Sequence, residues 1–163
     1  MRQSLCFALI SCCILLCCCK KAKEKKPYVP VQLCTEISNN IDTINKYIYG
    51  RWEWLEEKRI NQISGEIEYL TPKTEGYTLG LTLAGDTAYF YKDNKPDSTY
   101  RFLIMRERDI TGMADDNLPV LTFFRFSPGV RQSYVPIKIC KEQLLMQHQF
   151  VTSLGGQRIW KRL

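Results

Sequence analysis

The chain has 163 residues, 23 Lys and Arg against 17 Asp and Glu (net charge +6), and eight cysteines. This length suits one domain of ordinary size and excludes a large multidomain enzyme. The totals resemble those of a nucleic-acid-binding or disulfide-rich protein, but their distribution argues against both. Six cysteines lie within the first 19 residues and five lysines within 20–26, whereas residues 33–163 carry 17 basic and 16 acidic side chains and two cysteines. We therefore expect a nearly neutral domain with no nucleic-acid partner.

The first segment, residues 4–19, is the uncharged apolar sequence SLCFALISCCILLCCC. It is shorter than the roughly 20 residues of a membrane span and has the length of a signal-peptide core. Within it, Leu9-Ile10-Ser11-Cys12 resembles the bacterial lipobox, in which the cysteine is acylated and becomes the new N-terminus. This resemblance predicts a lipoprotein signal and anchor over 1–19, with palmitate attached at Cys12, and a protein on the periplasmic side of a bacterial cell envelope.

Two features favour a different anchor. Only eleven residues precede Cys12, and the lysines that follow the apolar segment oppose the positive-inside rule. The alternative is an uncleaved N-terminal membrane anchor whose clustered thiols are S-palmitoylated beside a basic segment. Both interpretations place the protein on a membrane.

Residues 20–32, KKAKEKKPYVPVQ, carry charge and two prolines without apolar periodicity, which predicts an extended lysine-rich tether. Its lysines either interact with anionic headgroups, at about 1 kcal/mol each, or belong to a spacer that separates the domain from the bilayer. The folded domain is predicted to cover 33–163.

A short helix is predicted over 35–48, because Ile37, Ile41, Ile44 and Ile48 are four, three and four residues apart. Thr35 is the expected N-cap, and Gly50 is expected just past the end of the helix.

Beyond this helix the apolar period changes to two, which indicates strands with one buried face. Turns rich in Gly, Asp, Asn and Pro are expected at 84–86, 92–97 and 127–129. The strands are expected at 77–83, 87–91, 99–106, 120–126, 134–140, 143–150 and 157–161. This spacing predicts an all-β antiparallel meander, closed as a barrel or folded as a sandwich.

Several short motifs resemble, in order and spacing, the lipocalin-like domains of small bacterial lipoproteins. They are Gly50-x-Trp52, Thr71-Pro72, Gly76-Tyr77, Gly85-Asp86 and Trp160-Lys161-Arg162. The resemblance covers residues 49–163 and implies an eight-stranded antiparallel up-and-down barrel, lipocalin-like, with a short N-terminal helix. It also implies that Trp52 closes one barrel end and stacks on the terminal Arg162 or on Arg158, a structural contact of about 0.5–2 kcal/mol.

Aromatic side chains recur at even spacing within each predicted strand. They are expected to form the barrel core, or in part to line a ligand cavity. With Arg162, these candidates are Trp52, Trp54, Tyr77, Tyr89, Tyr91, Phe102, Phe124 and Phe126. Phe90 and Phe123 have the opposite parity, which predicts a place under the helix or in an exposed patch.

Cys34 and Cys140 are the only thiols of the predicted domain. Outside the cytoplasm they are expected to form a disulfide, worth up to about 4–5 kcal/mol for a loop of this length. On a cytosolic membrane face they would instead be two free, buried thiols.

No motif indicates catalysis. His148 is the only histidine, which argues against a zinc site, and the sequence has neither a nucleophile elbow nor a phosphate-binding loop. We expect no catalytic residue, no metal and no cofactor. The predicted function is that of a monomeric, membrane-anchored, lipocalin-like binding protein that holds a small apolar ligand. The alternatives are a filled barrel that acts as a surface module in envelope maintenance and, third, a hydrolase with an unrecognised site.

Overall fold

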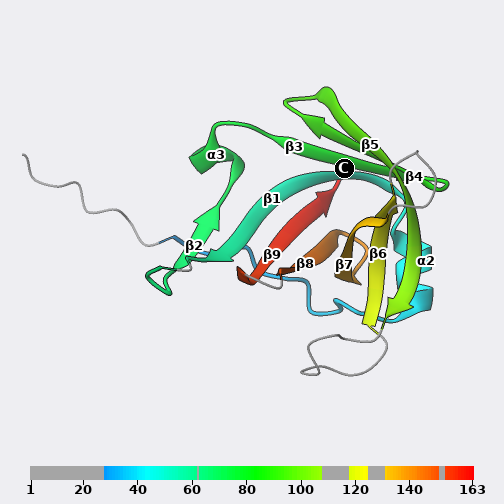
Figure 1. Ribbon diagram of the computed structural model, residues 1–163, viewed down its shortest axis with the longest axis horizontal. Helices are drawn as coiled ribbons and strands as arrows, with labels where there is room; N and C mark the ends of the chain where they lie inside the picture. Colours follow the sequence, from blue (N-terminus) through cyan, green and yellow to red (C-terminus); the bar gives the residue numbers. More distant parts are fainter. Residues whose placement is uncertain (1–27, 62, 108–117, 125–130, 151–152) are drawn as a thin grey trace, which may run out of the picture.

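A computed structural model describes residues 28–61, 63–107, 118–124, 131–150 and 153–163. In chain order its elements are α2 (Ile41–Tyr47), β1 (Gly50–Ile60), β2 (Ile67–Leu70), α3 (Pro72–Glu75), β3 (Leu79–Ala84), β4 (Thr87–Lys92), β5 (Lys95–Glu107), β6 (Leu118–Phe124), β7 (Arg131–Ile139), β8 (Gln143–Phe150) and β9 (Ser153–Arg162). Figure 1 shows the strands curving around one interior, with α2 at its side.

The strands form a closed antiparallel barrel. Strands β3 to β9 follow one another in the sheet, each paired with its neighbours in the chain. Strand β1 closes the barrel: β3 pairs with Gly50–Glu53 at its start, and β9 pairs with its other side. The short strand β2 pairs with residues 57–60 at the far end of β1 and does not take part in the closure. The predicted meander is thus confirmed, and it is a closed eight-stranded barrel with a short N-terminal helix.

The barrel interior holds the hydrophobic core. Trp52, Trp54 and Trp160 are each at most 1 % exposed, and they belong to a core to which every barrel strand contributes at least one buried apolar side chain. Ile44 and Ile48, which are fully buried, join the same core from α2 and its C-cap. The interior wall therefore continues into the helix that covers one end.

The helix is shorter than predicted. It begins at Ile41 after an Asn40 cap, whose side chain accepts hydrogen bonds from the backbone N–H groups of Asp42 and Thr43. The prediction of a Thr35 cap was wrong because Ser38 exchanges two backbone hydrogen bonds with Ile139, which holds this segment extended. Gly50 does not follow the helix end directly; it is the first residue of β1.

The turn between β4 and β5 is tighter than the predicted loop over 92–97. It consists of Asp93 and Asn94 alone, with φ values of 50° and 60°, as in the two-residue hairpins that suit twisted strands. A tighter turn allows β5 to begin at Lys95, four residues before the predicted start.

The inward face of β4 is also the opposite of the predicted one. Phe90 lies opposite the buried Leu81 and packs against the core. Tyr89 and Tyr91 therefore face outward, and Tyr89 is 39 % exposed. Successive residues of a strand point to opposite faces, so a one-residue error exchanges core and surface.

The same correction applies to β6. Phe123 lies opposite the buried Phe102 and is 5 % exposed, so it belongs to the core, whereas Phe124 faces outward. Phe126 lies outside the described residues, as does Cys12.

Candidate functional site

One end of the barrel is closed by a latch formed by Gly50, Trp52 and Arg162. The guanidinium carbon of Arg162 lies 4.3 Å from the centroid of the Trp52 ring, which is the contact that the sequence resemblance implies. The indole N–H of Trp52 donates to the carbonyl of Ile48, 3.0 Å away. The guanidinium also donates to three backbone carbonyls, those of Tyr47, Tyr49 and Lys141. The latch thus joins the last strand to the helix end.

Gly50 is the residue that makes room for the latch. Its φ is +133°, and a Cβ placed there would lie 2.7 Å from Nη1 of Arg162. The Gly-x-Trp motif therefore has a structural basis in this chain. The absence of a side chain at Gly50 leaves room for the guanidinium of Arg162, which packs against the Trp52 ring.

A charged cluster lies further along the inner wall. An irregularity in the pairing of β1 with β9, between Trp54 and Glu56, turns Glu57 to the same face as Arg158. Glu57 is 5 % exposed, and its carboxylate accepts hydrogen bonds from Arg158, whose Nε is 2.8 Å away, and from Arg59. Burial raises the pKa of Glu57, but the hydrogen bonds and charges of Arg59 and Arg158 outweigh it and hold the pKa below its ordinary value. Glu57 is thus a buried carboxylate that stays ionised.

Aromatic side chains adjoin this cluster. Trp54 stacks on Tyr77 with ring centroids 5.8 Å apart, and the Lys92 ammonium lies 4.3 Å from the Tyr77 centroid. The guanidinium of Arg158 lies 5.9 Å from the Trp160 centroid. Among the described residues, the buried indole N–H groups of Trp54 and Trp160 have no hydrogen-bond partner. Each is a donor that an acceptor atom of a bound molecule would satisfy.

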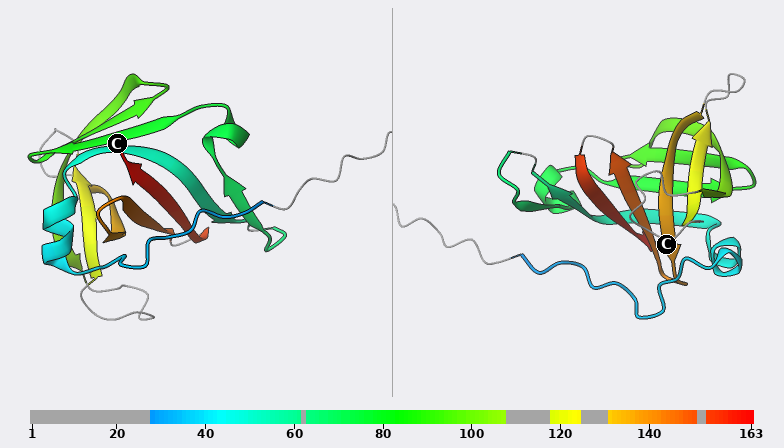
Figure 2. Two further views of the ribbon diagram at one scale, coloured as in Figure 1. Left: turned by 180° about the vertical axis from the view of Figure 1, so that it is seen from behind. Right: turned by 60° about the horizontal axis from the view of Figure 1, so that its bottom comes forward.

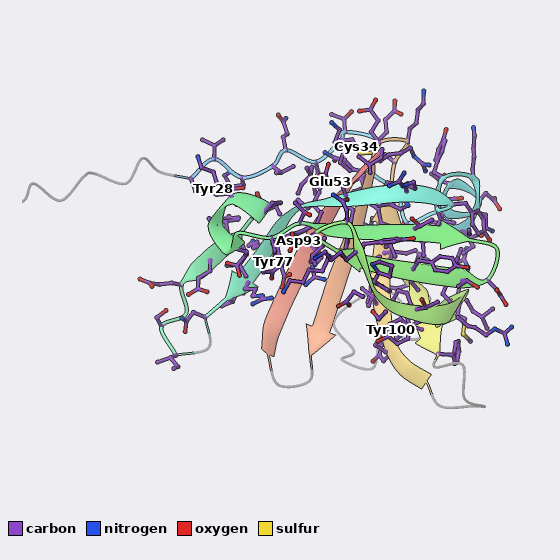
Figure 3. The ribbon with its side chains drawn as sticks, turned by 90° about the horizontal axis from the view of Figure 1, so that it is seen from above. Tyr28, Cys34, Glu53, Tyr77, Asp93 and Tyr100 are labelled. Atoms are coloured by element: carbon purple, nitrogen blue, oxygen red, sulfur yellow. A yellow bond between two sulfur atoms is a disulfide. The ribbon has the colours of Figure 1, made fainter. Side chains whose placement is uncertain are left out.

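A groove of about 380 Å³ lies on the outer wall of the barrel, over β1, β3 and β4. Figure 3 labels Glu53, which stands on this wall, and Asp93, whose turn borders it. Gly80 leaves the floor open beside Tyr91, the residue opposite it in β4. The other outward residues of the lining are Arg51, Glu53, Thr78, Thr82, Asn94 and Leu163. The groove therefore offers one aromatic face, two hydroxyls, an amide and a pair of opposite charges.

Residues 28–34, which we name the strap, lie along the outer face of the barrel (Figure 2). The Tyr28 hydroxyl and the Val31 N–H each donate to Oε2 of Glu56 at 2.7 Å, and Glu56 is 2 % exposed. Burial, together with the hydrogen bond and charge of Glu56, raises the pKa of Tyr28 to about 12. The described part of the predicted tether therefore packs on the barrel.

The other end of the strap is fixed to the turn between β7 and β8. Cys34 forms a disulfide with Cys140, and its N–H donates to the side chain of Gln143 at 2.8 Å. The Gln143 amide in turn donates to the Gln32 carbonyl. Figure 3 labels Tyr28 and Cys34 at the two ends of the strap.

The residues predicted as site candidates thus divide between two surfaces. Trp52, Trp54, Phe102 and Arg162 lie on the inner wall, whereas Tyr89, Tyr91 and Phe124 lie on the outer one. Sequence reasoning missed the Glu57 cluster, because a strand irregularity leaves no trace in the periodicity.

Neither metal-binding groups nor a membrane-spanning helix is found in the described part of the chain. No group of three or more His, Cys, Asp and Glu residues there is placed to hold a metal ion. The helices within the same ranges are too short and too polar to cross a bilayer. Compared with family models and with curated proteins, the chain gives no match.

Proposed function

We propose that this protein is a membrane-anchored, lipocalin-like binding module of a bacterial cell envelope that makes its contacts through the outer groove. The observation that carries the proposal is the position of that groove. The inward side chains of the described strands form one continuous core, whereas the space of about 380 Å³ lies on the outer wall. Binding at a side wall leaves the packed interior undisturbed.

The partner that fits the groove is a polar segment of another envelope protein. Arg51 and Glu53, two residues apart on the same face of β1, present opposite charges, and Thr78, Thr82 and Asn94 can exchange hydrogen bonds with a peptide. Tyr91 provides the aromatic surface that is enriched where proteins bind one another. Catalysis and a bound cofactor are not part of this proposal.

Photocrosslinking in the native envelope tests the groove. A benzoylphenylalanine at position 91 is expected to form a discrete adduct, whereas the same group at position 89 is not, because Tyr89 lies outside the lining of the groove. Gly80→Leu fills the floor from the outside and is expected to abolish the adduct at position 91. Equal adducts at both positions, or an adduct that survives Gly80→Leu, would contradict the proposal.

The membrane anchor is supported by Leu9-Ile10-Ser11-Cys12 within the apolar segment 4–19. Incorporation of a palmitate analogue is expected to be lost in Cys12→Ala. Cys6→Ala is the matched control, because Cys6 lies within the same apolar segment but has no small residue of the lipobox before it. Unchanged labelling of Cys12→Ala would refute the lipobox and favour acylation of the other cysteines.

A second candidate function is retention of a small molecule inside the barrel. It is favoured by the unpartnered indole N–H groups of Trp54 and Trp160, which adjoin the Glu57 cluster. Such a ligand would be mostly apolar and carry one acceptor group. Native mass spectrometry of protein purified from its own envelope distinguishes the two, because a ligand held in the core survives gentle purification.

A further inference from the structure

The hairpin that joins β1 and β2 exposes an unusual amount of apolar surface. Ile63 at its tip is 98 % exposed and Ile67 in β2 is 51 % exposed. Val29, which is 82 % exposed, follows Tyr28, and the Tyr28 ring packs against Tyr69 of β2 with centroids 5.1 Å apart. Ile67 and Tyr69 share one face of β2. We name Val29, Ile63 and Ile67 the hairpin surface.

The tip of this hairpin is an ordered turn. Oδ1 of Asn61 accepts the backbone N–H groups of Ile63 at 2.9 Å and Ser64 at 3.2 Å. The backbone N–H of Gly65 donates to the carbonyl of Asn61, and that of Asn61 donates to Glu66, each at 2.8 Å. Ile63 is therefore held out in water by a formed turn, which costs free energy unless something covers the side chain.

The position of the strap indicates what covers the exposed Ile63 side chain. The described chain begins at Tyr28, against β2 and on the far side of the barrel from α2 (Figures 1 and 2). Fifteen residues separate Tyr28 from Cys12, so an anchored chain holds this side of the barrel within roughly 50 Å of the lipid, even when fully extended. Five lysines at 20–26 lie directly before Tyr28 and favour an anionic surface.

The charges around the hairpin permit this approach. Lys58 and Arg59 precede the tip, and Glu66 and Glu68 follow it, so the hairpin itself is balanced. The side-chain amide of Asn61 also donates a hydrogen bond to the Glu68 carboxylate, which gives one of the two carboxylate oxygens a partner. Attraction to anionic headgroups therefore comes from the lysines of the tether, and contact with the lipid chains comes from the isoleucines and Val29.

We propose that the hairpin surface inserts into the headgroup region of the anionic bilayer to which the chain is anchored. The inference rests on the proposed membrane anchor and adds an orientation: β2 faces the lipid. The strap is fixed at both Glu56 and Cys140, so it transmits that orientation to the whole barrel.

Depth-dependent quenching on the full, lipidated protein tests this orientation. An environment-sensitive fluorescent amino acid is placed at position 63, or at position 95 in the β4–β5 hairpin as the reference, and the protein is reconstituted in vesicles of phosphatidylethanolamine and phosphatidylglycerol. At position 63 we expect a shift of emission to shorter wavelength and quenching by brominated lipids. At position 95 we expect the emission found in water.

Matched variants show whether the insertion is specific. Ile67→Asp is expected to reverse the shift at position 63, whereas Leu103→Asp, at a residue of β5 that is also 50 % exposed, is expected to leave it in place. Protein that floats with the vesicles but emits at position 63 as in water would overturn the docking alone. Protein that does not float would overturn the anchor, and the docking with it.

Discussion

Replacing Gly50 with alanine tests the latch, because it places one methyl group against Arg162. At φ +133° an L-residue is strained, at a cost of about 1–3 kcal/mol. The new Cβ would lie 2.7 Å from Nη1 of Arg162, so the guanidinium has to move. Its displacement weakens a cation–π contact worth about 0.5–2 kcal/mol and hydrogen bonds from a charged donor. We expect Gly50→Ala to lower the free energy of unfolding by about 3–5 kcal/mol.

Gly85→Ala is the matched control. Gly85 also has a positive φ, +56°, but nothing lies within 4 Å of a Cβ placed there. Its cost is therefore the left-handed backbone alone, about 1–2 kcal/mol. The expected difference between the two variants is about 2–3 kcal/mol, and most of it comes from the crowding of Arg162.

Urea unfolding followed by tryptophan fluorescence gives both values, because all three tryptophans, Trp52 of the latch among them, are buried in the folded barrel. The cycle is completed by Arg162→Ala: in that background Gly50→Ala should cost only the backbone strain, about 1–3 kcal/mol. A Gly50→Ala variant no less stable than Gly85→Ala, or one whose cost is the same with and without Arg162, would refute the reasoning.

Three further predictions concern the disulfide between Cys34 and Cys140, the buried carboxylate of Glu57 and the hydroxyl of Tyr28. Replacing Cys34 and Cys140 together by serine opens a link between residues 106 apart and should lower the free energy of unfolding by up to about 4–5 kcal/mol; an unchanged urea midpoint would argue against the bond. The pKa of Glu57 is lowered in the folded state, so its stabilising contribution is present above its unfolded pKa near 4.5 and is lost as pH falls through the folded value. In Glu57→Gln the free energy of unfolding should therefore fall less steeply as the pH is lowered. The same fall in both proteins would contradict this. The pKa of Tyr28 is raised to about 12, so its contribution to stability is complete below its unfolded pKa of 10.0 and is lost between pH 10.0 and about 12. Tyr28→Phe should remove this loss of stability, which is measured as the dependence of Tm on pH. A loss that persists in the variant would place its origin elsewhere.

The meander could be predicted because its signals are local. Alternating apolar residues and turns such as Gly85-Asp86 depend on neighbouring positions in the chain, and these elements appear close to where the sequence places them. The faces of β4 and β6 could not be predicted, because aromatic residues occupy both faces of each strand: Tyr89 and Tyr91 flank Phe90, and Phe124 follows Phe123. Apolar periodicity therefore does not decide which of the two sets of aromatic residues faces the core.

The strap could not be predicted either. Its residues look like a tether because they carry prolines and no apolar period, and their contacts depend on a carboxylate 25 or more positions away. Glu56 gives no sign of this role in the sequence, since an acidic residue in a strand is most often solvated. The helix start was missed for a similar reason, because the pairing of Ser38 with Ile139 joins distant segments.

The intact mass of the protein purified from its own envelope, measured under native conditions, tests the central claim most directly. We predict the mass of a chain that begins at Cys12, increased by a diacylglycerol modification and an acyl chain, reduced by two hydrogens for the disulfide, and with no small molecule retained. The mass of the unmodified chain from Met1 would contradict the anchor, and a stoichiometric bound molecule released only on unfolding would move the binding site from the outer groove to the barrel interior.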